Sequence, residues 1–128
     1  MATSNPQVTI PGLLAGADLS SKQYHQVKLD SNGKVVACSA TTDVPIGVLQ
    51  NAPDNTLEKA AVVACGGTTK LVAGGALATP GTALGTKNDG RAQAATSSQY
   101  SILRSIGTSG ADGDIIEAVF IATARDAT

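Results

Sequence analysis

The sequence predicts an all-β fold, in the form of a compact small β-barrel or a two-sheet sandwich. Three observations lead to this prediction. Short runs rich in β-branched residues recur along the chain and are bounded by Gly, Asn, Asp, Pro and Ser. No stretch of the sequence keeps a helical period of 3.6 residues. The chain also matches itself once, which predicts a molecule built from two pseudo-two-fold-related halves.

Eight runs have the composition of strands, since each is rich in Val, Ile, Leu, Tyr or Ala and ends beside a turn-forming residue. They are residues 24–29, 34–38, 46–50, 60–65, 70–73, 91–94, 100–106 and 115–121.

The segments between these runs are expected to be turns and loops. Residues 30–33 and 88–90 end in Asn-Gly and Asp-Gly, pairs that tolerate positive φ and favour tight hairpins. Residues 66–70 carry a Gly-Gly pair and are expected to form a flexible loop that links the two halves. Only residues 18–23 have the composition of a helical turn, with Asp18 as its N-cap.

The internal repeat relates residues of about 13–65 to residues of about 71–122. Leu13 to Leu19 aligns with Leu71 to Leu77 at an offset of 58 residues. From Asn32 onward the offset is 57, which places Asn32-Gly33-Lys34 on Asp89-Gly90-Arg91 and, further along, Ile46 on Leu103, Leu49 on Ile106 and Val63 on Phe120. The alternative is that a chain rich in Ala and Gly aligns with itself by chance.

The two halves are expected to share one core. Leu, Ile, Val and Phe together number 28 of the 128 residues, which is close to the lower limit for a folded chain. A half with so few large apolar side chains cannot close a core of its own. We therefore expect a single domain over residues 13–128, preceded by an extended arm over residues 1–12.

Composition and charge argue against several classes of protein. No apolar run approaches the roughly 20 residues that span a bilayer, and the first residues lack the basic start and apolar stretch of a signal peptide. A net charge of −1 and only three aromatic side chains argue against nucleic-acid binding. We expect no membrane partner, and reduced, buried thiols at Cys38 and Cys65 in a protein made in a cytoplasm.

The sequence offers no constellation of residues that supports catalysis, a metal or a cofactor. His25 is the sole histidine and is expected to lie on a strand, exposed or partly packed. Ser31 and Lys34 have the spacing of a serine acylase, but they bracket a tight turn instead of one turn of helix. Asp112 and Asp114 lack the other ligands of a calcium loop and are expected to be solvated turn residues. We therefore expect a protein that is not an enzyme.

Four stretches of the chain resemble the capsid cement, or head decoration, proteins of tailed bacteriophages. The likeness extends over roughly residues 13–121, and its motifs are turn-and-strand patterns. They are AGADLSSKQY at 15–24, VKLDSNGKVV at 27–36, DVPIGVLQN at 43–51 and ADGDIIE at 111–117.

The resemblance implies a structural virion protein that is made in the cytoplasm of a bacterial host and binds the outside of the phage head. There it would cement neighbouring major capsid subunits and stabilise the shell, often as a homotrimer. It implies no catalysis and no cofactor, and the family has no catalytic set to carry over to this chain.

Residues 1–12 lie outside both the repeat and the resemblance. Pro6 and Pro11 disfavour helix, and Val8 and Ile10 alternate with polar neighbours. We predict that these four residues mark an arm that contacts the capsid or a sister subunit by adding a strand to its edge. The alternative is a disordered tail.

Two other functions stay open. A biotinyl- or lipoyl-type carrier domain is also a small β-barrel with internal two-fold symmetry. It would need a modifiable lysine at a hairpin tip, where this chain offers Lys34 and Lys87, although neither is flanked by a carrier motif. The second alternative is another phage structural or adhesive module.

Overall fold

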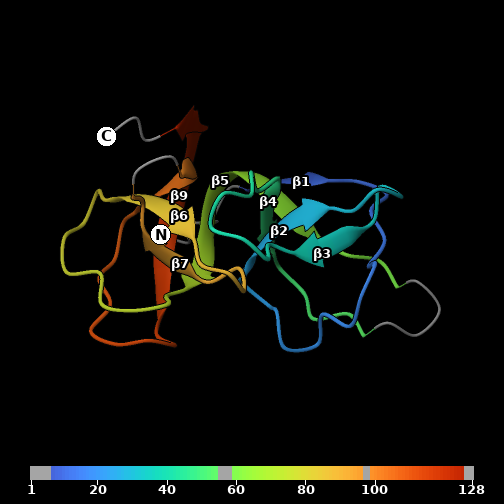
Figure 1. Ribbon diagram of the computed structural model, residues 1–128, viewed down its shortest axis with the longest axis horizontal. Coiled ribbons are helices and arrows are strands. Elements are labelled where there is room, and N and C mark those ends of the chain that lie inside the picture. The colour runs from blue at the N-terminus through green and yellow to red at the C-terminus, as the bar shows by residue number, and fades with distance from the viewer. Residues whose placement is uncertain (1–6, 55–58, 97–98, 126–128) are drawn as a thin grey trace, which may run out of the picture.

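The all-β prediction is confirmed by the computed structural model, which describes residues 7–54, 59–96 and 99–125 (Figure 1). In these ranges the chain forms nine strands and no helix. The strands are β1 (Gln7–Ile10), β2 (Gln26–Leu29), β3 (Val35–Ala37), β4 (Gly47–Leu49), β5 (Val63–Val72), β6 (Ala83–Thr86), β7 (Ala92–Ala94), β8 (Tyr100–Ser105) and β9 (Ile115–Arg125).

The strands make one curled, antiparallel sheet with the shape of a half-barrel. Its order is β3-β2-β4-β5-β9-β8-β6-β7, and β1 pairs with β5 beside this path. Figure 1 shows β2, β3 and β4 on one side of the long strand β5, and β6, β7 and β9 on the other. The expected barrel is therefore an open one, in which β5 and β9 join two lobes.

The strand order is the same in both lobes when it is followed outward from the centre. The first lobe runs β5-β4-β2-β3 and the second runs β9-β8-β6-β7. Strands β6 and β7 each lie 57 residues after β2 and β3. Parallel bridges join Ala15 to Val35 and Ala73 to Ala92, at the offsets of 58 and 57 that the sequence gives. These pairings support the repeat, which itself stays a prediction.

The alignment of the halves changes after β3 and β7. Val27 pairs with Gly47, and Leu84 pairs with Leu103, so Leu103 takes the place of Gly47 and not of Ile46. The cause is a shorter loop before β8. Val27 pairs with Ala37 and Gly47, which are ten positions apart, whereas Leu84 pairs with Ala94 and Leu103, which are nine positions apart.

The core consists of two clusters instead of the single shared one that we expected. Each lobe carries one, and β4 connects them because it is buried on both faces. Leu49 belongs to the cluster of the first lobe, while Val48 belongs to the cluster of the second. Because β4 lies between the two apolar clusters, each half buries its few large side chains in a cluster of its own.

Strand β5 runs without a break through residues 66–70, where the sequence predicts a loop. Strand β1 explains this difference. Val8 pairs with Gly66, and a Cβ added at Gly66 would lie 3.2 Å from the Cβ of Val8. Gly66 thus lets β1 approach closely and pair with residues 63–67, while β9 pairs with residues 68–72. Every residue of the segment therefore has a strand partner, although Gly67 takes a left-handed φ of 80°.

Strand β6 was not predicted, because Ala83 and Gly85 have low strand propensity. The repeat would have predicted this strand, since β6 lies 57 residues after β2, which the sequence does predict.

The helical turn expected at residues 18–23 is wrong. These residues form non-helical turns, in which Asp18 Oδ1 accepts a hydrogen bond from the N–H of Ser20.

Tyr24 ends this turn region in the left-handed conformation, with φ of 64°. It is the one non-glycine residue with positive φ in the described ranges. Its N–H donates to Leu49 O at 2.7 Å, and its carbonyl accepts from the N–H of Val72 at 3.0 Å. These two hydrogen bonds hold the residue in a conformation that costs about 1–3 kcal/mol.

The two predicted hairpin turns are confirmed and end in matching glycines. Gly33 has φ of 76° and Gly90 has φ of 92°. Their surroundings differ, since a Cβ added at Gly33 meets nothing within 4 Å, whereas one at Gly90 would lie 2.7 Å from Gln26 O. Gly33 is therefore required only by its turn, while Gly90 also permits the contact between the lobes.

Gly33→Ala and Gly90→Ala separate these two effects. We expect Gly33→Ala to lower the free energy of unfolding by about 1–2 kcal/mol, the cost of left-handed backbone for alanine. Gly90→Ala should cost roughly 2 kcal/mol more, because its methyl group overlaps the backbone of Gln26. Urea denaturation measures both variants. Equal losses in the two variants would contradict the proposed contact.

Candidate functional site

The predicted arm folds back on its own chain. Val8 and Ile10 lie in β1, Pro11 is exposed in the turn that follows, and Pro6 lies outside the described residues. Strand β1 pairs with residues 63–67 of β5, next to residues 68–72, which pair with β9. Strand β9 thus leaves residues 63–67 of β5 open for β1, and the expected contact of the arm with the capsid or a sister subunit stays a prediction.

The two apolar side chains of the arm have different surroundings. Ile10 is half-buried and packs against the cluster of the first lobe, opposite Val63. Val8 is 60% exposed. The pairing register skips Cys65, and such a β-bulge changes the twist of the paired strands. The arm is thus anchored through Ile10 and presents Val8 to the solvent.

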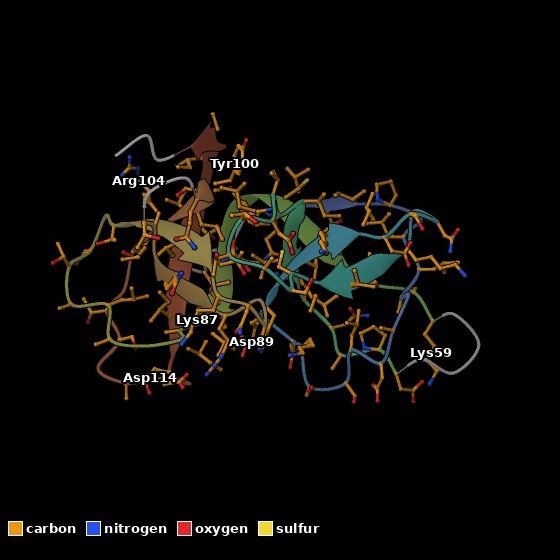
Figure 2. The ribbon with its side chains drawn as sticks, viewed as in Figure 1. Lys59, Lys87, Asp89, Tyr100, Arg104 and Asp114 are labelled. Carbon is orange, nitrogen blue, oxygen red and sulfur yellow. The ribbon has the colours of Figure 1, made fainter. Side chains whose placement is uncertain are left out.

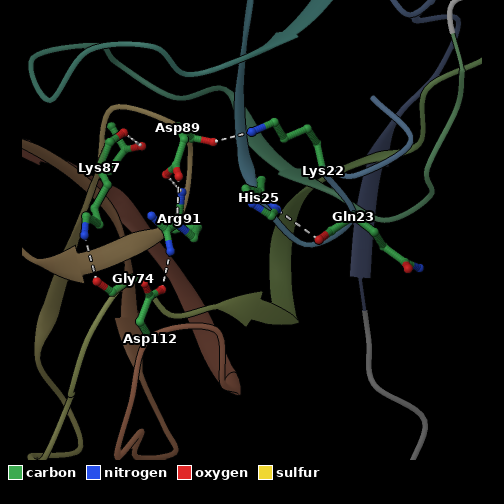
Figure 3. Close-up of polar contacts among 9 residues, drawn as sticks. Lys22, Gln23, His25, Gly74, Lys87, Asp89, Arg91 and Asp112 are labelled. Atoms are coloured by element: carbon green, nitrogen blue, oxygen red, sulfur yellow. Dashed lines mark hydrogen bonds and ion pairs between the residues drawn. The ribbon is translucent and has the colours of Figure 1, made fainter. Parts of the chain in front are cut away.

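A second candidate is a group of charged side chains between the lobes (Figure 3). Arg91 Nε pairs with Asp89 Oδ2 at 2.7 Å, and Arg91 Nη1 pairs with Asp112 Oδ1. Lys22 Nζ donates to the carbonyl of Asp89 at 3.5 Å, and Lys87 Nζ donates to Gly74 O at 2.9 Å. These contacts tie the 87–91 hairpin to both lobes.

The electrostatics of this group are those of a structural ion-pair network. Desolvation raises the pKa of Asp89, but the hydrogen bond from the Arg91 N–H and the Arg91 charge lower it by more, so the net shift is downward. Asp112, expected to be a solvated turn residue, is 56% exposed and paired with Arg91. In the described ranges no three His, Cys, Asp or Glu side chains gather as metal ligands.

Outside this group, further ion pairs among the described residues join Lys28 to Asp43 at 2.9 Å and Lys59 to Asp54 at 3.2 Å. Figure 2 shows Lys87 and Asp89 near the middle of the molecule, with Lys59 and Arg104 toward its two ends. Asp114 Oδ2 accepts hydrogen bonds from the N–H groups of Gly110 and Ala111, so it closes its own turn. The aspartates of these pairs and turns thus have partners within the chain.

His25 and the Ser31–Lys34 pair, which were considered for catalysis from the sequence, are held in buried and turn positions of the fold. His25 is buried, with 8% of its surface exposed, and its Nδ1 lies 3.1 Å from Gln23 O. Burial lowers the pKa of His25, and the carbonyl of Gln23 opposes this only in part. Ser31 and Lys34 flank the first hairpin turn, in which Asp30 Oδ1 accepts from the N–H of Lys34 at 3.0 Å.

The two cysteines differ, and the prediction for one of them is wrong. Cys38 is buried, and desolvation raises its pKa to about 12. Cys65 is exposed, although we expected it to be buried at the end of a strand. Because β5 continues to Val72, Cys65 sits inside a long strand at the β-bulge that faces β1.

A polar hollow of about 240 Å³ is the site that the sequence did not indicate. It is lined by Gln7, Tyr24, Gln50, Thr69 and Lys70. These residues come from β1, the turn before β2, the position directly after β4 and the second half of β5. Because they are spread over half of the chain, from residue 7 to residue 70, no sequence motif contains them. The only hint in the sequence is the alternation of residues 7–10, which places Gln7 in a strand.

The comparisons with known proteins give no assignment: no family model, no curated protein and no solved structure matches the chain. None of the described residues forms a helix that is long and apolar enough to cross a membrane.

His25 makes stability depend on pH. Because the folded chain holds the imidazole proton more weakly than the unfolded chain, the free energy of unfolding should fall as the pH drops from 7 toward 5. Carboxyl groups titrate mainly below this window, and His25 is the sole histidine. Urea denaturation of wild type and His25→Gln across this range should show a slope that the variant flattens. An unchanged slope in the variant would contradict this assignment.

The cysteines should differ in reactivity toward a thiol reagent such as an aromatic disulfide. Cys65 is exposed, whereas Cys38 is buried and its thiol stays protonated at neutral pH. We expect one of the two thiols to react in the folded protein and both in urea. Cys65→Ser should abolish the reaction of the folded protein, and rapid reaction of that variant would show that Cys38 is accessible.

Proposed function

We propose that this protein is a structural component of a virion, which binds the outer surface of a phage head and cements neighbouring major capsid subunits. The resemblance over residues 13–121 suggests the role. The structural observation that carries it is β1, a strand that is fixed to the domain and exposes Val8.

Strand β1 has the properties of a docking edge for a partner strand. It shares Val63 and Ala64 with β4, so β1 and β4 lie on opposite edges of β5. In the described part of the chain, no strand pairs with the outer edge of β1. An extended segment of a capsid subunit could therefore hydrogen-bond to it, with Val8 as the apolar contact. Because β1 is already ordered on β5, docking would lose little conformational entropy.

The charge of the protein suits a dense lattice of copies. The net charge is −1, and the pairs that Arg91 and Lys28 make with aspartates are internal to the chain. Neighbouring copies would therefore repel one another little. A protein that contacts several subunits at once, or that associates with itself as a trimer, also gains avidity without a large interface at each contact.

A carrier function receives less support from the two hairpin lysines. Lys87 Nζ donates a hydrogen bond to Gly74 O at 2.9 Å, and the side chain of Lys34 is half-buried. A carrier domain instead needs a lysine that reaches freely from the hairpin tip into the active site of its partner enzyme.

Co-sedimentation with expanded, DNA-free heads of tailed phages tests the proposal. We expect saturable binding of the wild-type protein and a higher temperature of head disruption. Val8→Asp should weaken binding by about tenfold or more, as loss of a central apolar contact does. Val44→Asp is the matched control, because Val44 is also exposed, at 46%, but lies in the loop before β4.

Two outcomes would count against this function. Absence of binding to any head that lacks its own cement protein would contradict capsid cementing. Equal binding by Val8→Asp and wild type, with both proteins folded by circular dichroism, would contradict the role of β1 while leaving attachment through another surface.

A further inference from the structure

We propose that the hollow beside Tyr24 binds a single sugar residue, a small neutral ring that carries several hydroxyl groups. The inference does not depend on capsid binding. It rests on three observations: a rigid polar wall, lining groups that keep free hydrogen-bonding capacity, and a strained aromatic residue at the rim.

The polar wall is fixed by a network of side-chain amides. Gln50 Nε2 donates to Thr69 Oγ1 at 2.7 Å and to Val48 O at 3.1 Å. Gln7 Nε2 donates to Gln50 Oε1 at 3.1 Å and to Thr68 O at 3.0 Å. Both amide groups thus use their two N–H donors, which fixes their orientation. A wall of this kind is ordered before any ligand arrives, so binding loses little side-chain entropy.

Three lining groups keep hydrogen-bonding capacity. They are the Tyr24 hydroxyl, the Lys70 ammonium and the Gln7 Oε1 atom, none of which has a hydrogen-bond or ion-pair partner among the residues that the structure describes. Lys70 supplies donors, Gln7 Oε1 supplies an acceptor, and a phenol supplies both. Neighbouring hydroxyl groups on a sugar ring match this set, because each hydroxyl both donates and accepts.

Tyr24 is the most informative member of the site. Its φ of 64° is a conformation that glycine adopts without strain, so a glycine would serve the turn better than a tyrosine. The side chain must therefore contribute something that the turn itself does not need. An aromatic ring beside polar groups supplies an apolar face for the C–H groups of a sugar, together with a hydroxyl.

Charge and size favour this class over other small ligands. Lys70 lies opposite Glu117 in the pairing of β5 with β9, which offsets its charge and makes the site a weak one for anions. The lining contains no carboxylate, histidine or thiol, so it does not suit a metal ion. A volume of about 240 Å³ lies below the range of pockets for drug-sized ligands, which begins at about 300 Å³.

Nuclear magnetic resonance titration of the ¹⁵N-labelled full-length protein tests the proposal. The probes are methyl glucoside, methyl galactoside and N-acetylglucosamine, with acetate and glycerol as controls. We expect at least one sugar to shift the amide signals of Thr69 and Lys70 in a saturable manner, and neither control to do so at equal concentration. Tyr24→Gly and Gln50→Ala should weaken that sugar's binding by tenfold or more.

The variants are chosen so that loss of binding is not mistaken for loss of folding. Tyr24→Gly removes backbone strain, so its unfolding midpoint should be no lower than that of wild type. Gln93→Ala is the matched control for Gln50→Ala, because Gln93 lies in β7 away from the hollow, and it should bind as wild type does. The proposal is overturned if no sugar binds, if acetate binds equally well, or if folded Tyr24→Gly binds as tightly as wild type.

Discussion

The fold depends on the close contact between Gln26 and the second half of the chain. Gln26 is fully buried, its N–H donates to Gly90 O at 2.7 Å, and its Nε2 donates to Gly85 O at 3.0 Å. Gly90 makes the approach possible, because a Cβ at this position would lie 2.7 Å from Gln26 O. Buried amide groups need such partners, so these bonds fix how the two lobes meet. The apolar clusters then fill the space on either side.

The same contact positions His25 and the polar hollow beside Tyr24. Tyr24, His25 and Gln26 are consecutive, so the turn that brings Gln26 to the second lobe also buries the imidazole and places the tyrosine at the hollow. The strained backbone of Tyr24 follows from its two hydrogen bonds, one to Leu49 of β4 and one to Val72 of β5. Residues without a common motif thus become neighbours through the topology of the sheet.

The sequence predicts most of the strands and turns, but it does not predict the polar hollow or the exposure of Cys65. Asn-Gly and Asp-Gly mark the hairpins because their conformational preference is local, and β-branched runs mark most strands. The continuity of β5 depends on its pairing with β1 and β9, which both lie more than forty residues away in the sequence, and the exposure of Cys65 depends on that continuity. The hollow needs residues from four segments to meet. Such features arise from long-range pairing, which periodicity and composition do not record.

The arm has a consequence for how the molecule can orient itself on a surface. The strand order outward from the centre is the same in the two lobes, as the predicted two-fold relation between the halves requires. Strand β1 lies on β5, and in the described residues no strand takes the corresponding place on β9. Strand β1 therefore makes the two lobes distinguishable. On the proposed capsid lattice, a two-fold-symmetric molecule would bind in two equivalent orientations, whereas β1 would select one of them.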